Sequence, residues 1–284
     1  MAPTTPRRGR GGVSGSAPIV MGILNVTPDS FSDGGEYLET GAAAARAGEM
    51  LDEGAGIIDV GGESTRPGSE PVPADEEARR VLPVIREILA ARPEAVISVD
   101  TYHADTAEAA IEAGAGIVND ITALNGDPRM ASVVAGAGCP VVLMHMLGEP
   151  KTMQESPRYD DVVAEVRGFL ARRAEAAISA GVREEDVILD PGIGFGKTLE
   201  HNLALVQNLD AIAGIGFPVL FGASRKSFIG KLSGGEARDP DERLFGTVAA
   251  SVLAYERGAK IFRVHDVRAN REALEVAAAV VNAS

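Results

Sequence analysis

Short apolar runs rich in Val and Ile alternate along the chain with longer segments rich in Ala, Glu and Arg. The eight runs cover residues 18–26, 56–61, 95–100, 116–121, 140–146, 187–190, 218–224 and 260–265. None of them alternates cleanly between apolar and polar positions. Such continuous runs are typical of strands that are covered on both faces, as in a parallel sheet.

The segments between the runs have the spacing of amphipathic helices. Acidic residues fill the first turn of residues 75–91, and an apolar stripe follows at helical intervals. Several of these segments end in a Gly-Ala motif, as at Gly54 and Gly114, where glycine can form the left-handed cap that stops a helix. The joints from helix to strand are therefore short, whereas the loops from strand to helix, such as 27–39 and 63–74, are long. This asymmetry is typical of barrel enzymes, whose sites lie at the carboxyl ends of the strands.

Eight strand–helix units in 284 residues predict an α/β fold of the TIM (β/α)8 barrel type. An open doubly wound sheet is the alternative, and the count of eight favours the barrel. We predict one barrel domain over residues 18–284. Residues 1–17, in which three Arg lie among Pro, Gly and Ser, are predicted to form a disordered tail.

Composition narrows the classes of function. The chain has 27 Lys and Arg against 41 Asp and Glu, a formal net charge of −14, which argues against binding to nucleic acid or to an anionic membrane surface. The uncharged stretch 130–148 is broken by Gly136, Gly138 and Pro140, so no transmembrane helix is expected. The single cysteine, Cys139, excludes an intrachain disulfide and fits a reducing cytoplasm.

Each apolar run ends in polar residues that strand propensity does not favour. In chain order they are Asn25, Asp59 with Glu63, Asp100, Asn119 with Asp120, His145, Asp190, Ser224 with Lys226, and Arg263 with His265. Turn formation could explain any one of them. In a barrel, however, all would converge on one mouth, and a full ring of polar side chains indicates a binding site.

The chemistry of this ring indicates the kind of ligand. Carboxylate and amide groups at Asp100, Asn119 and Asp190 suit a flat heterocycle with an N–H edge. Cationic groups also follow the strands, at Lys197, Arg225, Lys226, Arg263 and His265. In a chain this acidic they indicate an anionic group, most simply phosphate, and we expect Lys197 and Lys226 to act on a ligand.

The segments that carry these residues resemble the dihydropteroate synthase family of pterin-binding barrels. They are residues 22–35, 61–68, 98–101, 119–121, 144–146, 190–197, 224–226 and 263–266. The resemblance implies a transferase of folate biosynthesis that condenses 7,8-dihydropterin-CH2-pyrophosphate with p-aminobenzoate, giving 7,8-dihydropteroate and pyrophosphate. It implies that pyrophosphate leaves first and that the amine then attacks a cation-like carbon. It also implies Mg2+, a homodimer, and sulfonamides as inhibitors that occupy the aminobenzoate site.

The resemblance also assigns roles around the pterin and the reacting carbon. Asn25 would hold Mg2+ through its side-chain oxygen. Asp190 would accept from the pterin amino edge, Asp100 and Asn119 would complete the pocket, and Lys226 would donate to the pterin. Asp33, Asp100 and Lys226 are the expected catalytic residues, with Asp100 near the developing cation and Asp33 in a loop that closes over the site.

The remaining implied contacts serve the pyrophosphate and the benzoate. Those of the pyrophosphate are Thr65, Arg66, Arg263 and His265. Those that enclose the benzoate ring are Pro67, Phe195 and the stem of Lys226, while Ser224, expected at a helix N-terminus, would receive the carboxylate. Met144 is expected to line the substrate site.

Two other functions stay open at this point. A pterin-dependent methyltransferase domain would share the pterin carboxylates but has no need for the loop at 65–68 or for residues 224–226. A non-catalytic paralogue that binds a pterin-like ligand or a partner should have lost loop residues, and none of the positions above is lost.

Overall fold

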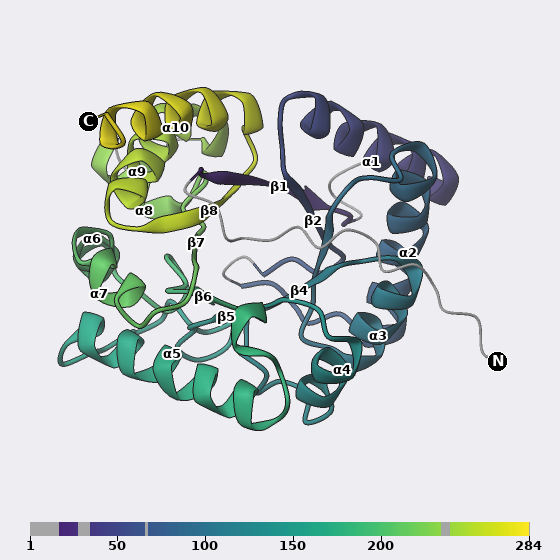
Figure 1. The fold of residues 1–284 in the computed structure, drawn as a ribbon, viewed down its shortest axis with the longest axis horizontal. Coiled ribbons are helices and arrows are strands. Elements are labelled where there is room, and N and C mark those ends of the chain that lie inside the picture. The colour runs from purple at the N-terminus through teal and green to yellow at the C-terminus, as the bar shows by residue number, and fades with distance from the viewer. Residues whose placement is uncertain (1–16, 28–34, 66–67, 234–238, 284) are drawn as a thin grey trace.

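A computed structural model of the chain describes residues 17–27, 35–65, 68–233 and 239–283. Eight parallel strands close into a barrel in chain order, each hydrogen-bonded to its two neighbours (Figure 1). The strands are β1 (Ile19–Asn25), β2 (Ile57–Gly61), β3 (Ile97–Asp100), β4 (Ile117–Asp120), β5 (Val141–Met144), β6 (Val187–Asp190), β7 (Val219–Phe221) and β8 (Ala259–Val264). The TIM-barrel prediction is confirmed, and the open sheet is ruled out. The predicted tail lies outside the described residues except for Ala17.

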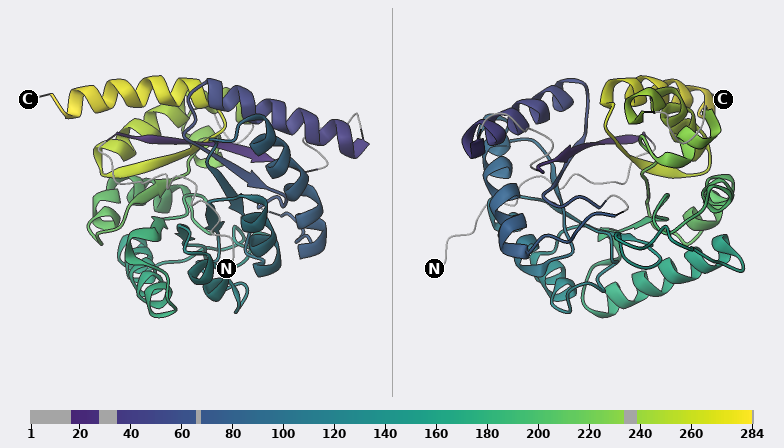
Figure 2. Two further views of the ribbon diagram at one scale, coloured as in Figure 1. Left: turned by 45° about the vertical axis from the view of Figure 1, so that its right-hand side comes forward. Right: turned by 180° about the vertical axis from the view of Figure 1, so that it is seen from behind.

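The helices form an outer layer around the barrel (Figure 2). They are α1 (Gly35–Asp52), α2 (Ala74–Ala91), α3 (Ala104–Ala113), α4 (Met130–Ala137), α5 (Val162–Ser179), α6 (Leu199–Gln207), α7 (Leu209–Ala213), α8 (Ser227–Ser233), α9 (Leu244–Glu256) and α10 (Val267–Val281), with short 3-10 turns η2 (Glu184–Asp186) and η3 (Pro240–Arg243). Eight helices were predicted, but two connections each carry a pair. One pair, α6 and α7, is separated by Asn208, whose φ of −115° and ψ of 33° leave the helical region. The other pair, α8 and α9, lies between β7 and β8, and Pro240 starts η3 ahead of α9.

Both faces of the strands are buried, which explains why the apolar runs do not alternate. One buried cluster lies between the strands and the helices. A second fills the inside of the barrel with Met21, Ile57, Ile117, Val142, Ile188, Leu220 and Ile261. No helix in the described part of the chain is long and apolar enough to span a membrane.

The inward-facing positions become polar two residues further along the strands. Side chains in a strand change face at every residue, so the residue two beyond an inward apolar one also points inward. On β2, β4, β6 and β8 this step leads from Ile57 to Asp59, from Ile117 to Asn119, from Ile188 to Asp190 and from Ile261 to Arg263. The strands therefore build an apolar floor with a polar layer directly above it.

Candidate functional site

Asp59, Asp100 and Asn119 form a hydrogen-bonded network with Arg263 inside the barrel. Nε of Arg263 donates to Oδ2 of Asp59 at 2.6 Å, and Nη2 of the same guanidinium donates to Oδ2 of Asp100 at 2.6 Å. Nδ2 of Asn119 donates to the same Asp59 oxygen at 3.1 Å. Residues from β2, β3, β4 and β8 are thus joined in one hydrogen-bonded network.

Burial changes the pKa values of the charged groups in this network. It raises the pKa of Asp100 to about 7. The charge of Arg263 opposes this rise, and the charge of Asp59 adds to it. Burial alone would lower the pKa of Arg263, but Asp59 and Asp100 outweigh it and the pKa is raised. Arg263 is therefore a permanent cation, whereas Asp100 can change its charge near neutral pH.

A second group of site residues lies at the end of β6 and in the loop that follows it. Oδ1 of Asp190 accepts from the backbone N–H of Gly192 at 2.7 Å. Nζ of Lys226 donates to the carbonyl of Ile193 and lies 4.6 Å from the centre of the Phe195 ring. Burial lowers the pKa of Lys226 to about 8, opposed by the charge of Asp190. The ammonium group remains mostly charged at neutral pH and is stabilised by the ring face.

The loop after β6 requires glycine to reach this position. Gly192, Gly194 and Gly196 have φ of 64°, 84° and 64°, which lie in the left-handed region. A Cβ at Gly192 would also overlap the carbonyl oxygen of His145. The glycines let the backbone turn tightly around the end of β5, which places Phe195 beside Lys226.

The expectation that Lys197 acts on a ligand is wrong. Its side chain is only 3% exposed, and Nζ lies 2.9 Å from the carbonyl of Gly192, 3.0 Å from that of Phe195 and 3.0 Å from Nδ1 of His145. Burial lowers the pKa of Lys197 to about 7 and that of His145 to about 3. Lys197 holds the loop after β6 against the end of β5.

Two other polar residues noted after the strands, Asp120 and Arg225, are engaged in contacts outside the pocket. Both oxygens of Asp120 accept hydrogen bonds from residues of its own loop, including the N–H groups of Thr122 and Leu124. The guanidinium of Arg225 forms two hydrogen bonds with Asp266, at 3.0 and 2.7 Å. Arg225 is therefore paired with Asp266 instead of joining the cations of the pocket.

Ser224 and His265 form a pair at the ends of β7 and β8. Oγ of Ser224 lies 2.9 Å from Nδ1 of His265 and accepts from the His265 N–H at 3.1 Å. Helix α8 begins only at Ser227, so the prediction that Ser224 stands at a helix N-terminus is wrong. The geometry instead couples the hydroxyl of Ser224 to the imidazole of His265.

Two side-chain oxygens lie near Gly61. A Cβ at Gly61 would lie 3.6 Å from Oδ2 of Asp100, which also accepts from Arg263, and 3.8 Å from Oδ1 of Asn25. The described residues contain no cluster of three or more His, Cys, Asp or Glu that could hold a metal. A site with one or two protein oxygens suits Mg2+, which takes its other ligands from water and phosphate.

Comparison with known proteins identifies the family. The family described as "Pterin binding enzyme" matches residues 21–265. Dihydropteroate synthase of Escherichia coli K12 is 48% identical over 268 residues, which cover 94% of this chain and 93% of that protein. The chain belongs to the dihydropteroate synthase family of pterin-binding enzymes.

Two solved structures of this family from Xanthomonas albilineans share the fold. One, with 4-aminobenzoic acid, has a TM-score of 0.88 at 47% identity and covers 94% of each chain. The other, in complex with 7,8-dihydropteroate, has a TM-score of 0.85 at 45% identity and covers 94% of this chain and 95% of the other. The resemblance inferred from the motifs is thereby confirmed over most of the chain.

The structure places most of the residues that the family resemblance assigned. Asp100, Asn119, Asp190, Lys226 and Arg263 lie in the networks described above. Met144 is buried and is the register partner of Asp190 in the next strand. Thr65 is half-buried in the loop after β2. Asp33, Arg66 and Pro67 lie outside the described residues. The roles that the resemblance assigns to all of these residues stay predictions.

The sequence shows Asp59 at the end of a strand, but its role could not be predicted there. The available signal was its spacing. Asp59 follows the inward-facing Ile57 by two positions, as Asn119 follows Ile117. Its importance depends on Arg263, which lies 204 residues away, and this pairing could not be read from the chain.

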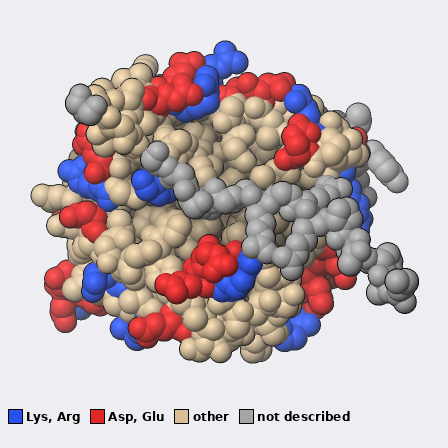
Figure 3. All heavy atoms as spheres, in the orientation of Figure 1, with Lys and Arg blue, Asp and Glu red and all other residues tan. Residues whose placement is uncertain are grey.

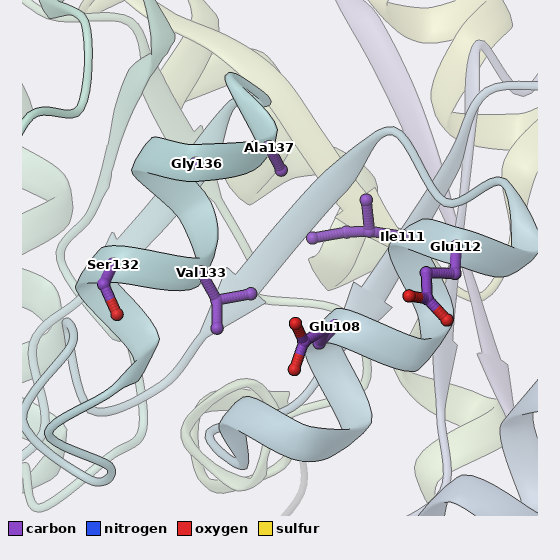
Figure 4. A pocket seen from close by; sticks show the side chains of 7 residues that line it. All are labelled: Glu108, Ile111, Glu112, Ser132, Val133, Gly136 and Ala137. Atoms are coloured by element: carbon purple, nitrogen blue, oxygen red, sulfur yellow. The ribbon is translucent and has the colours of Figure 1, made fainter. Parts of the chain in front are cut away.

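The outer surface of the described residues carries mixed charges and a hollow between two helices. On the face in Figure 3, acidic and basic groups are interspersed around the rim, without a continuous basic surface among the described residues. A hollow of about 260 Å³ lies in the outer layer between α3 and α4. It is lined by Glu108, Ile111 and Glu112 of α3 and by Ser132, Val133, Gly136 and Ala137 of α4 (Figure 4). It contains none of the residues from the strand ends.

Proposed function

We propose that this chain condenses 7,8-dihydropterin-CH2-pyrophosphate with p-aminobenzoate to give 7,8-dihydropteroate and pyrophosphate. The observation that carries the proposal is the polar layer above the barrel floor, where Asp100, Asn119 and Asp190 are combined with the cations Arg263 and Lys226. The names of the relatives, and the two Xanthomonas complexes with the amine substrate and with the product, support the same reaction.

The pterin would bind edge-on to Asp190. The bond from the Gly192 N–H fixes the plane of the carboxylate, so the group is oriented before the ligand arrives. Two N–H groups on one edge of the pterin match a carboxylate acceptor. Lys226 would donate to an acceptor on the ring, since its pKa of about 8 leaves it charged at neutral pH.

Departure of pyrophosphate is the difficult step, because the C–O bond breaks with separation of charge. Arg263, His265 and Thr65 would donate to the leaving phosphates. Asn25 would hold Mg2+, which when bound supplies positive charge to the leaving group. The ionised form of Asp100 would stabilise the carbon that becomes cation-like. The aniline nitrogen then forms the new C–N bond and loses a proton.

The amine substrate would lie against Phe195 and the stem of Lys226. The contact between the Lys226 ammonium and the Phe195 ring keeps both side chains at one side of the mouth. Ser224, paired with His265, would donate to the carboxylate of the benzoate. This arrangement would direct the amine toward the reacting carbon.

We also propose that two copies of the chain associate through α9 and α10. These helices pack against each other and carry large apolar side chains on their outer surfaces, namely Phe245 and Leu253 on α9 and Val276, Val280 and Val281 on α10. Phe245 is 83% exposed. An apolar stripe on two adjacent helices is typical of a subunit interface. A cytoplasmic location, inferred from the single cysteine, stays a prediction.

A product assay with both substrates tests the function. We expect dihydropteroate and pyrophosphate to form in equal amounts, only when both substrates and Mg2+ are present. A chain that binds the pterin but forms no product would be the non-catalytic paralogue, and methyl transfer from a methylated folate to a corrinoid would indicate the methyltransferase.

A further inference from the structure

Asp59 is fully buried, with 0% of its surface exposed, yet only half of its carboxylate is used. Oδ2 accepts from Nε of Arg263 and from Nδ2 of Asn119. Oδ1 is also buried, and it has no hydrogen-bond partner among the described residues. Its neighbours in the register of the barrel are Ile23 on β1 and Ser98 on β3.

Such an arrangement is unfavourable for the fold alone. A buried carboxylate loses its hydration, and a bare oxygen does not recover that loss. The number of charges in the pocket also argues against a purely stabilising role for Asp59. Asp59, Asp100 and Asp190 are three carboxylates around two cations, Arg263 and Lys226. Without Asp59, each remaining carboxylate would still have one cation.

What Asp59 does provide is orientation. Because Asn119 gives Nδ2 to Asp59, the amide is fixed with its carbonyl oxygen turned away from Asp59. Because Nε and Nη2 of Arg263 are held by Asp59 and Asp100 on two sides, the guanidinium plane is fixed as well. The carboxylate of Asp59 thereby determines the direction of two groups of the proposed substrate site, Asn119 in the pterin pocket and Arg263 beside the pyrophosphate.

We propose that Asp59 is a positioning residue of the pterin pocket, which fixes Asn119 as a hydrogen-bond acceptor and Arg263 as a planar donor. This inference rests on the proposed function. Asp59 itself is fully buried, and its contribution reaches the pterin substrate through Asn119 and Arg263. Substrate affinity, more than stability, should therefore depend on its charge.

The test compares Asp59→Asn with Ser98→Ala. Ser98 is the register partner of Asp59 on β3 and is also buried with an unpartnered Oγ, but it has no contact with Arg263 or Asn119 among the described bonds. The readouts are the Kd of 6-hydroxymethylpterin by calorimetry, the KM of each substrate and Tm. Asp59→Ser serves as a second variant, since a hydroxyl is already tolerated at Ser98.

We expect Asp59→Asn to weaken pterin binding at least about tenfold and to leave Tm within about 3 °C of the wild type. The KM of the pterin substrate should rise while that of p-aminobenzoate stays within about twofold, and Ser98→Ala should bind the pterin like the wild type. A structural role would give the opposite result, a large fall in Tm with unchanged affinity.

Three results would overturn the inference. They are pterin affinity in Asp59→Asn within twofold of the wild type, equal weakening in Asp59→Asn and Ser98→Ala, and failure of both Asp59 variants to fold. Failure of the proposed function would look different, because the wild-type chain itself would then form no dihydropteroate, whatever its affinity for the pterin.

Discussion

Nη2 of Arg263 donates to Oδ2 of Asp100 at 2.6 Å, although the two residues are 163 positions apart in the chain. The strands that carry them, β3 and β8, are separated by β1 and β2 in the barrel. The long Arg263 side chain therefore reaches across the inside of the barrel and meets Asp59 on the way. This contact makes the charge of Asp100 dependent on a residue from the last strand.

The pH dependence of catalysis should report the ionisation of Asp100. Its pKa of about 7 lies above the ordinary value because of burial, so the ionised fraction rises between about pH 6 and pH 8. Since the ionised form would stabilise the cation-like carbon, kcat should rise with pH through about 7 and then level off. Asp100→Asn should lower kcat by about 100-fold and abolish this rise. Steady-state rates from pH 5.5 to 9 measure both, and a rise with the same midpoint in Asp100→Asn would assign it to another group.

Asp190→Asn should weaken pterin binding by about 2–4 kcal/mol, because an NH2 group would replace one acceptor oxygen opposite the N–H edge of the ring. Calorimetry with a pterin lacking pyrophosphate measures this loss. Asp186→Asn is the matched control, since Asp186 is buried just before the other end of β6 and pairs with Arg183. Equal affinity of Asp190→Asn and the wild type would remove Asp190 from the pocket.

Phe195→Leu should raise the KM of p-aminobenzoate about five- to tenfold and leave pterin affinity unchanged. The substitution removes the ring that lies 4.6 Å from Nζ of Lys226 and that would enclose the benzoate. Phe217 lies two residues before the first residue of β7, at the opposite end of the barrel. Phe217→Leu should change neither the KM of p-aminobenzoate nor the pterin affinity. A rise in the KM of both substrates would show instead that the variant disturbs the whole mouth.

Lys197→Met should lower the free energy of unfolding by about 2–3 kcal/mol, because it removes the donor that Nζ supplies to the carbonyls of Gly192 and Phe195. The pKa of Lys197 is lowered to about 7 in the folded chain, whereas an unfolded lysine titrates near 10.4. Between these values the unfolded chain binds the extra proton, so this lysine makes stability rise with pH. Denaturant unfolding at pH 7 and pH 9.5 should show that rise reduced in Lys197→Met. An unchanged rise would mean that Lys197 is charged in the folded chain at both pH values.

Phe245→Glu should convert the dimer proposed above to a monomer of 29.4 kDa. A charge in the centre of an apolar interface must lose its hydration without a partner. Sedimentation velocity measures the change, with Leu203→Glu on α6 as the control, since Leu203 is also an exposed large apolar side chain. A monomeric wild type, or a dimeric Phe245→Glu, would contradict the proposed interface.

The sequence by itself determined the barrel and the strand ends at which its site lies. Continuous apolar runs marked β1 to β8 within a few residues, because both faces of a barrel strand are buried and neither face selects polar residues. The polar residues at the ends of these runs stood out for the same reason. Local motifs around Asp190 and Lys226 were long enough to indicate the family before any contact was known.

Only the tertiary structure decided which of those polar residues act together. Asp59 was assigned no role because its partners lie on β4 and β8, and Lys197 was misassigned because its buried carbonyl partners are formed by a turn. Strand ends are a local property that sequence spacing records. The direction of a side chain beyond the strand depends on the loop that follows, and the pairing of charges depends on barrel closure, which brings residues more than 100 positions apart within hydrogen-bond distance.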